Sequence, residues 1–335
     1  MKTKSKSFLS AACLSFGRAI AVGAVLLFAA SVPAQNLFVS VFQYNVPFTP
    51  ASTIIEITPG GAQSTFASGL GEPFGPAFNG AGNLFEADYY SGDIYEFTPG
   101  GGQSTFASGL NYPCALAFNH AGNLFETDYG SGNIYEFTPG GGQSTFASGL
   151  NYPYALAFDN AGNLFVGDQG SGNIYEFTPG GARSTFASGL GSLYALAFDS
   201  AGNLFEADGS SGNIYAFTPG GTRSTFASGL NDPDALAFDN AGNLFATDIS
   251  GNIYAFTPAG ARSTYASVTG VPEGLAFDPP PVPEPSVSGL AAIGAVSLLI
   301  CRRRRNSRGI TLSRDSTRRR QRFYRPGNEP VGQRW

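Results

Sequence analysis

Residues 111–150, NYPCALAFNHAGNLFETDYGSGNIYEFTPGGGQSTFASGL, decide the fold because close copies of this stretch fill most of the 335-residue chain. Its Asn-Leu-Phe motif recurs at residues 83, 123, 163, 203 and 243. Its Ser-Thr-Phe-Ala motif recurs at residues 64, 104, 144, 184 and 224. Motifs that return every 40 residues indicate one supersecondary unit repeated along the chain.

Each repeat contains four short apolar or aromatic runs. In the quoted copy these runs are 115–118, 123–127, 133–137 and 143–147. They are bounded by Gly, Pro, Asn and Asp, which is typical of strands joined by tight turns, and no window shows a helical period. Four antiparallel strands in about 40 residues are typical of one blade of a β-propeller.

The number of strands predicts the number of blades. The second, third and fourth strand types of the repeat each occur six times, whereas the sixth copy of the first type appears only at the end, as Gly274–Phe277. We therefore expect an all-β, closed six-bladed propeller over residues 35–281. Gly274–Phe277 should pair with the blade that contains Leu37–Val41 and so remove the free sheet edge.

The repeat consensus is Pro-x-Ala-Leu-Ala-Phe-Asp-x-Ala-Gly-Asn-Leu-Phe followed by Asn-Ile-Tyr, and it covers roughly three-quarters of the chain. This pattern resembles NHL-type repeats and the related repeats of gluconolactonase/regucalcin and virginiamycin-lyase propellers. The resemblance implies the propeller fold. It does not choose a function, because these propellers include both binding modules and enzymes.

The N-terminus has the features of a secretory signal peptide. Lys2, Lys4 and Lys6 precede an apolar run at 19–32, and Val32-Pro-Ala34 provides a small-residue cleavage site. We predict that residues 1–34 are removed on export.

The C-terminus has three parts in order. Val282-Pro-Glu-Pro-Ser286 precedes an apolar run at 287–301 and the cluster Arg302–Arg305. The apolar run would span about 22 Å as a helix, short of the ~30 Å bilayer core, and the arginines would hold its end in the cytoplasm. This arrangement resembles the PEP-CTERM sorting signal that an exosortase processes in Gram-negative bacteria. The resemblance implies an exported protein that is released or attached at the cell surface; a plain membrane anchor is the alternative.

Residues 306–335 form an Arg-rich tail with no core-forming pattern, and we predict that they are disordered. A nucleic-acid-binding tail and a read-through of the reading frame are the alternatives; on an exported protein we expect no nucleic-acid partner. We expect membrane contact only through residues 287–301. Cys114 is the one cysteine outside the two terminal segments, and we predict that it is a small apolar residue, not a nucleophile.

The propeller region is strongly acidic. Residues 35–278 contain 21 Asp or Glu and three Arg, a net charge of −18, whereas the whole chain has −5. Such a charge disfavours nucleic acid and anionic surfaces and suits divalent cations or cationic partners. Solubility alone is the alternative explanation.

The repeats differ most just before the first strand of each blade. One residue per blade varies there, and further variable residues flank it; the set proposed to form a ligand face is Phe74, Tyr112, Tyr152, Tyr154, Tyr194 and Asp232. Cys114, Asp234 and Glu273 complete the ring, with Glu72 nearby. Variation confined to one face is what a binding site on a repeated scaffold would produce, and drift in tolerant loops is the alternative.

Asp234 and Glu273 are the candidate metal ligands. Gluconolactonase-like propellers hold a divalent metal through side chains at this loop position, and Pro233-Asp234 and Pro272-Glu273-Gly274 match two such positions. A third ligand is missing from the pattern. Oxygen ligands favour Ca²⁺ or Mg²⁺, so weak calcium binding is expected.

Other polar residues are better explained by turns. Asp88, Asp128, Asp168, Asp208 and Asp248 each end a strand before a Ser-Gly turn or a close variant of it, which predicts turn capping. His120, the single histidine, lies in a turn, and no catalytic residue is predicted. The sequence therefore favours an exported cell-surface or extracellular-matrix module that binds a protein or glycan without catalysis. The alternative is a divalent-metal-dependent lactonase- or lyase-like enzyme.

Overall fold

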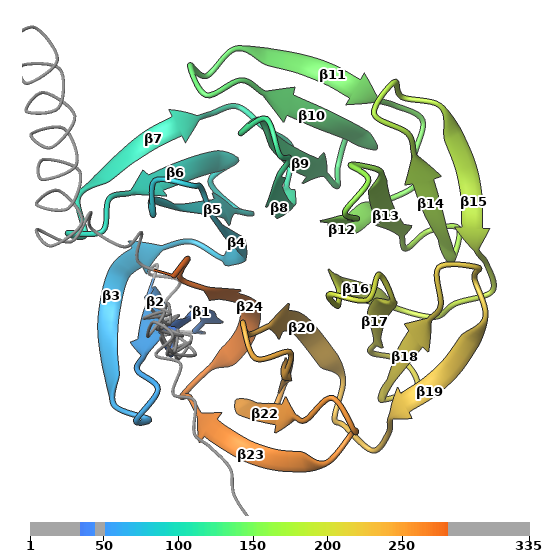
Figure 1. Cartoon of the computed structure of the whole chain (residues 1–335). Coiled ribbons are helices and arrows are strands. Elements are labelled where there is room, and N and C mark those ends of the chain that lie inside the picture. Colours follow the sequence, from blue (N-terminus) through green and yellow to red (C-terminus); the bar gives the residue numbers. More distant parts are fainter. Residues whose placement is uncertain (1–33, 44–50, 281–335) are drawn as a thin grey trace, which may run out of the picture. The chain divides into compact units, whose positions relative to one another are not determined.

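The computed structural model describes residues 34–43 and 51–280. These residues form 24 strands in six four-stranded antiparallel sheets, arranged as the blades of a ring (Figure 1). The predicted closed six-bladed propeller is confirmed. The predicted sorting signal, the basic tail and all of the predicted signal peptide except Ala34 lie outside the described residues.

The inner strands lie nearest the middle of the ring (Figure 1). Residues of all six inner strands line one space there, which we call the central channel. They are β4 (Pro73–Phe78), β8 (Pro113–Phe118), β12 (Pro153–Phe158), β16 (Leu193–Phe198), β20 (Pro233–Phe238) and β24 (Val271–Phe277). The second strands are β1 (Leu37–Phe42), β5 (Leu84–Asp88), β9 (Leu124–Asp128), β13 (Leu164–Asp168), β17 (Leu204–Asp208) and β21 (Leu244–Asp248).

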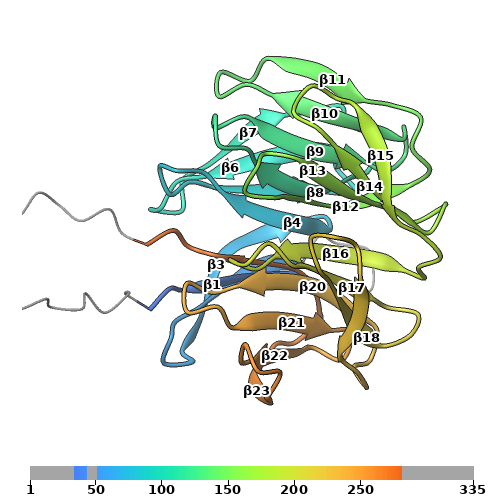
Figure 2. The ribbon, with the colours of Figure 1, turned by 45° about the vertical axis from the view of Figure 1, so that its right-hand side comes forward.

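The third strands are β2 (Ser52–Ile57), β6 (Asp93–Phe97), β10 (Asn133–Phe137), β14 (Asn173–Phe177), β18 (Asn213–Phe217) and β22 (Asn252–Phe256). The outer strands are β3 (Gln63–Leu70), β7 (Gln103–Ala107), β11 (Gln143–Ala147), β15 (Arg183–Ala187), β19 (Arg223–Ala227) and β23 (Arg262–Ser267). Figure 2 shows the same sheets in an oblique view.

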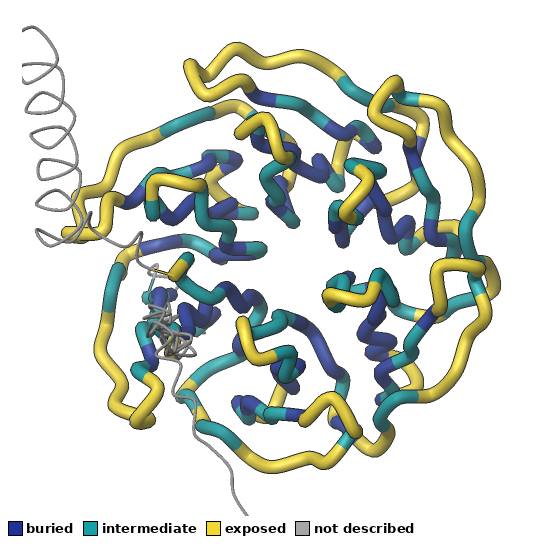
Figure 3. The backbone as a smooth tube through the Cα atoms, in the orientation of Figure 1, coloured by how far each residue is buried: buried dark blue, intermediate teal, exposed yellow. Residues whose placement is uncertain are grey.

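Burial changes from the second strands to the outer strands. Every residue of the second strands is buried, because a neighbouring blade covers each face of the sheet there. The Ser-Thr-Phe-Ala runs of the outer strands are exposed or half-buried and form the rim of the ring (Figure 3). The core therefore lies between the blades, close to the channel.

A repeated aromatic contact joins neighbouring blades. The ring of Phe85 on β5 meets Phe106 of its own blade at 5.0 Å and Phe118 of the next blade at 5.1 Å, both edge to face. The equivalent residue of every blade makes the same two contacts, with Tyr265 replacing phenylalanine once. Edge-to-face geometry is the favoured one for such rings, so the Asn-Leu-Phe motif fixes the packing of each blade on the next.

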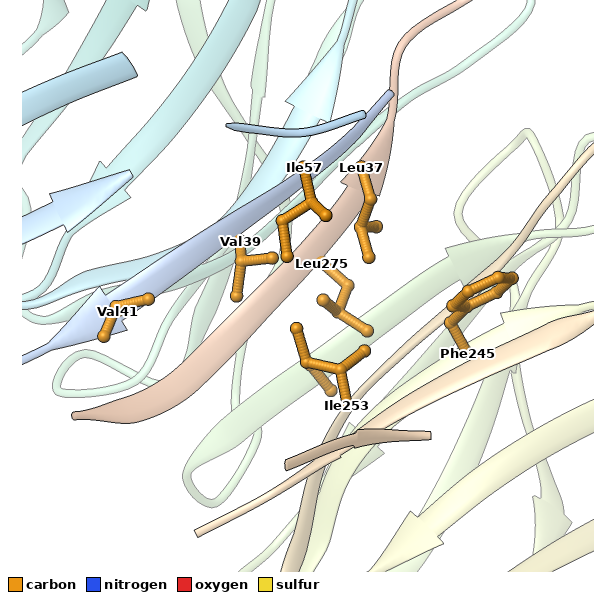
Figure 4. Packing of buried hydrophobic residues seen from close by; sticks show 8 residues of the cluster. Leu37, Val39, Val41, Ile57, Phe245, Ile253 and Leu275 are labelled. Carbon is orange, nitrogen blue, oxygen red and sulfur yellow. The ribbon is translucent and has the colours of Figure 1, made fainter. Parts of the chain in front are cut away.

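Strand β24 closes the ring. It pairs antiparallel with β1, with Phe277 opposite Leu37 and Leu275 opposite Val39. Leu37, Val39, Val41, Ile57 and Leu275 pack together with Phe245 and Ile253 of the neighbouring blade (Figure 4). The predicted pairing of the two ends of the repeat region is thus confirmed.

Within residues 34–43 and 51–280, no helix is long and apolar enough to cross a membrane.

Candidate functional site: the channel mouth

The channel mouth is the end of the central channel where the inner strands begin. Three residues of each inner strand line a cavity of about 100 Å³ there. The first of the three is the variable residue of its blade: Phe74, Cys114, Tyr154, Tyr194, Asp234 and Glu273. The cavity is smaller than the roughly 150 Å³ that holds a benzene molecule, so it admits a small group of a ligand.

These residues lie inside the inner strands, and the prediction that they precede the strands in loops is wrong. β8 starts at Pro113, which tolerates the first position of a strand. Pro113 pairs with Asp128, whereas Leu116 pairs with Glu126, so Cys114 and Ala115 lie opposite one residue of β9. Such a β-bulge redirects side chains, and comparable register shifts occur in the other inner strands. The bulges explain how the variable side chain of each blade reaches the channel.

An aromatic wall forms one half of the mouth. The ring of Tyr154 lies 5.6 Å from Phe74 and 5.4 Å from Tyr194, measured between ring centroids. Phe74 is buried, whereas Tyr154 and Tyr194 are half-buried. The three residues come from the second, fourth and fifth blades. The contact between Phe74 and Tyr154 thus spans the third blade, which carries the small side chain of Cys114.

An acidic wall forms the other half. Asp234 on β20 is 8% exposed, and its Oδ1 atom has no hydrogen-bond partner; the same holds for Oε2 of the half-buried Glu273 on β24. Burial, with smaller contributions from Asp234 and Glu72, raises the pKa of Glu273 to about 10. Burial, Asp232 and Glu72 likewise raise the pKa of Asp234 well above its usual value. Glu273 is therefore protonated at neutral pH.

Glu72, at the start of the second blade, joins this acidic wall. Burial raises the pKa of Glu72 to about 7, a hydrogen bond with Tyr90 lowers it, and Asp88 raises it. Glu72 acts electrostatically on both Asp234 and Glu273. The carboxyls of three successive blades therefore form one group. Sequence alone placed Glu72 only as a nearby residue.

A ridge of stacked tyrosines stands beside the mouth. Tyr112 stacks on Tyr89 at 4.7 Å between ring centroids, and Tyr152 stacks on Tyr129 at 4.8 Å. We call these four residues the tyrosine ridge. Tyr112 and Tyr152 are 44% and 50% exposed. Two of the predicted ligand-face residues therefore present aromatic surface to solvent.

The backbone at the ridge is held in an uncommon conformation. Tyr112, Tyr152 and Asp232 have φ angles of 61°, 59° and 54°, in the left-handed region that disfavours most side chains. The Tyr112 carbonyl accepts a hydrogen bond from the backbone N–H of Tyr129 on the next turn of the same blade. These bonds position each exposed ring over the turn of the preceding blade. Strain of this kind gathers at functional sites.

Tyr89 and Tyr129 were not among the predicted site residues. They directly follow the buried Asp88 and Asp128, where the later blades carry Gln169, Gly209 and Ile249. That divergence at an otherwise uniform position was the signal that could have identified them.

The buried aspartates act as caps, as predicted. Asp128 is 1% exposed; its Oδ2 accepts from the N–H of Asn111 at 2.8 Å and its Oδ1 from the N–H of Ser131 at 2.9 Å. Asp88, Asp168 and Asp208 make the equivalent pairs of bonds, and Asp248 accepts from Ser250 and Asn252. The first four carboxylates thereby tie a loop of the mouth face to a turn, whereas Asp248 caps its own turn.

We expect Asp128→Ala to lower the free energy of unfolding by about 2–4 kcal/mol, because two backbone N–H groups lose the buried carboxylate that accepts from them. Urea denaturation of the variant and the parent measures the difference. Asp93→Asn is the matched control, since Asn stands at the equivalent positions 133, 173, 213 and 252, and it should change stability by less than about 0.5 kcal/mol. Equal effects of both substitutions would contradict the capping role.

Three buried glutamates on the second strands also escaped the sequence analysis. Glu86, Glu126 and Glu206 are all 0% exposed. Glu86 accepts a hydrogen bond from the Ser40 hydroxyl of the neighbouring blade at 2.8 Å, whereas the carboxyls of Glu126 and Glu206 have no hydrogen-bond partner among the described residues. Burial is the main cause that raises their pKa values, to about 8 for Glu206.

The remaining candidates lack catalytic or metal-binding geometry. His120 is exposed in its turn, and the thiol of Cys114 is 1% exposed, with its pKa raised by burial and by nearby acids. In the part of the chain that the structure describes, no group of three or more His, Cys, Asp or Glu side chains is placed to hold a metal ion. The roles of Asp234 and Glu273 as calcium ligands stay predictions.

No family model and no curated protein matches this chain. Several solved structures are similar to it. A chain of the nidogen/laminin complex is similar with a TM-score of 0.65 and 20% identity, covering 74% of this chain and 99% of that one. A gluconolactonase from Xanthomonas campestris gives a TM-score of 0.59 and 16% identity, covering 72% and 87%. A streptogramin B lyase gives a TM-score of 0.53 and 16% identity, and the match covers 70% of this chain and 74% of the lyase chain.

What these proteins share with this chain is the propeller fold. At such identities the similarity concerns the fold alone, and functions differ among proteins of one fold. The similar structures include a binding complex and enzymes, so the predicted likeness to NHL- and gluconolactonase-type propellers holds for architecture.

Proposed function

We propose that this protein is an exported, non-enzymatic binding propeller whose ligand, a glycan, docks on the tyrosine ridge. The observation that carries the proposal is the exposure of Tyr112 and Tyr152 on strained backbone beside the mouth. A sugar ring packs its C–H face on an aromatic ring, while the tyrosine hydroxyl remains free for hydrogen bonds. The stacking on Tyr89 and Tyr129 holds the rings in place, which lowers the entropy lost on binding.

Titration with neutral oligosaccharides tests this proposal. We expect saturable quenching of tyrosine fluorescence, and a loss of affinity of about tenfold or more in the double variant Tyr112→Asn, Tyr152→Asn, because two stacking rings contribute about 1–3 kcal/mol. Asn tolerates the left-handed backbone, so the loops keep their conformation.

His120→Ala lies in a turn of the opposite face and is the control; its affinity should equal that of the parent. Unchanged affinity in the tyrosine variant, or no oligosaccharide binding by the parent, would contradict a glycan-binding ridge.

The proposed export has its own test. If residues 282–305 form a sorting signal, exosortase cleavage near Pro283-Glu284-Pro285 removes everything beyond it. Mass spectrometry of surface material is then expected to find peptides of the propeller and none from residues 306–335. Recovery of the intact Arg-rich tail from that material would refute the processing.

A second candidate function is a divalent-metal-dependent lactonase- or lyase-like enzyme. The observation that favours it is the pair of buried carboxyls, Asp234 and Glu273, in a cavity at the centre of the ring. Such an enzyme requires calcium or a similar ion at the mouth. A melting temperature that calcium raises in the parent, and not in the double variant Asp234→Asn, Glu273→Gln, would support it.

A further inference from the structure

The acidic wall of the mouth contains acceptors that nothing in the described structure satisfies. Oδ1 of Asp234 and Oε2 of Glu273 are buried without hydrogen-bond partners, and both residues line the cavity. A buried acceptor without a donor destabilises the folded state, and such groups in folded proteins call for an explanation. A ligand that brings N–H donors into the cavity would satisfy both oxygens.

The opposite wall suits a positive charge as well. Tyr154 and Tyr194 form a continuous aromatic surface with Phe74, and the nearby acids Asp234 and Glu273 act electrostatically on Tyr154. A cation held within about 6 Å of an aromatic ring is stabilised by the ring, and more strongly when it is removed from water. Carboxyls and aromatic rings thus flank the same small space.

The composition of the walls disfavours a metal ion as the occupant. Calcium takes six to eight oxygen ligands, whereas only two of the eighteen residues that line the cavity, Asp234 and Glu273, carry carboxyls. Within the described ranges, no group of three acidic, His or Cys side chains has metal-binding geometry. An organic cation needs fewer oxygen contacts and gains from the rings.

We propose that the cavity binds an ammonium group of an organic ligand, with its N–H groups donating to Asp234 and Glu273 and its charge lying against Tyr154 and Tyr194. The volume of about 100 Å³ accepts the head group of such a ligand, while the rest extends outward through the mouth. This inference goes beyond the tyrosine ridge: it uses different residues, and either site can fail without the other.

Binding is linked to the protonation of the two acids. The pKa of Glu273, about 10, leaves this acid protonated at neutral pH, and burial also raises the pKa of Asp234. An ammonium group favours the ionised forms of both acids, so its binding releases protons. The other titratable groups around them are Glu72, Asp232, Tyr154, Tyr194 and Cys114. The affinity for a primary ammonium ion, which stays charged up to about pH 9, is therefore expected to rise as the pH approaches the pKa of Glu273, about 10.

Methylammonium is the probe, with NaCl at the same ionic strength and methanol as the neutral isostere. At ten times its Kd, methylammonium should raise the melting temperature of the full chain by about 2–4 °C, because it binds only the folded state. The double variant Asp234→Asn, Glu273→Gln should lose at least about tenfold in affinity. The control Asp93→Asn, Glu176→Ala removes two carboxyls elsewhere and introduces residues that other blades carry, so it should keep the shift.

The source of the ammonium group is identified in a second arm that compares glucosamine with a lysine side chain as Nα-acetyl-lysine methylamide. A shift with either one that disappears in the Asp234, Glu273 variant supports the proposal. Three results would overturn it: an equal shift with methanol, no shift with any amine, or a shift with calcium and none with methylammonium. The last result would assign the cavity to a divalent metal.

Discussion

A chain that ends after Gly270 is expected to lose cooperative folding and to aggregate. The truncation removes β24, so β1 loses its antiparallel partner and the cluster around Leu37, Val39 and Ile57 loses Leu275. It also opens the ring between the first and last blades and leaves two exposed sheet faces, with β1 as an unpaired edge strand that invites association. Size-exclusion chromatography and thermal unfolding measure the result.

A chain that ends after Pro280 is the matched control for this truncation. It keeps β24 and Asp278, whose Oδ1 accepts from the N–H of Asn36 at 2.8 Å and whose own N–H donates to the Asn36 carbonyl. We expect this control to stay monomeric and to unfold in one transition. If the chain that ends at Gly270 behaved in the same way, closure by β24 would not be what holds the ring together.

Leu275→Ala is a milder form of the same test. Leu275 is 7% exposed, and its truncation should cost about 2–5 kcal/mol of unfolding free energy through lost burial and a residual cavity. A value well below that range would mean that the closing strand contributes little to the stability of the ring.

Glu206→Val is expected to stabilise the protein, and increasingly so as the pH rises. Glu206 is fully buried without a hydrogen-bond partner, and valine stands at the equivalent position of β13 as Val166. Burial, the main cause, and Asp208 raise the pKa of Glu206 from 4.5 to about 8, while Arg223 lowers it. The carboxyl is then protonated in the folded state and ionised in the unfolded state between these two pH values.

The sign of the pH dependence follows from this difference. Below pH 4.5 the carboxyl is protonated in both states and its titration has no effect on stability. Between pH 4.5 and about 8 the unfolded state loses the proton first, so the stability of the parent falls by about 1.4 kcal/mol per pH unit. The gain from Glu206→Val should therefore be larger at pH 8 than at pH 5, by an amount on the order of a few kcal/mol.

The reciprocal substitution Val166→Glu is the control for Glu206→Val. Val166 is 0% exposed, so a carboxyl introduced there should destabilise the protein, most strongly at high pH. Urea denaturation at pH 5 and pH 8 checks both variants. A gain from Glu206→Val that is the same at the two pH values would show that packing, and not the buried acid, determines the effect.

The architecture could be predicted from the sequence because its causes are local and repeated. Every blade carries the same apolar runs at the same spacing, and the turn residues between them determine strand lengths within a few positions. The repeat region begins with a second strand at Leu37 and ends with an inner strand at Phe277. This order of the strand types is visible in the sequence, which is why the pairing of β24 with β1 was predictable. The buried aspartates were recognisable as caps for the same reason, since each precedes a similar turn.

The details of the mouth depend on contacts between blades, which no repeat carries by itself. The bulges in the inner strands turn Phe74, Tyr154 and Asp234 into the channel, and they arise from pairing with the second strands and not from a local turn signal. The stacking of Tyr112 on Tyr89 joins residues of two blades. The burial of Glu206 likewise results from the sheet that covers it.

The sequence by itself thus determined the blade, the number of blades and the closing strand of this protein, because these follow from short-range hydrophobic periodicity and turn chemistry. Only the tertiary structure decided which side chains meet at the channel. Closure of the ring brings Glu72 close to Asp234 and Glu273, which lie far from it along the chain. Burial is the main cause of the raised pKa values of all three acids. It also leaves an oxygen of Asp234 and one of Glu273 without a hydrogen-bond partner. Burial is a property of the assembled ring and not of any segment.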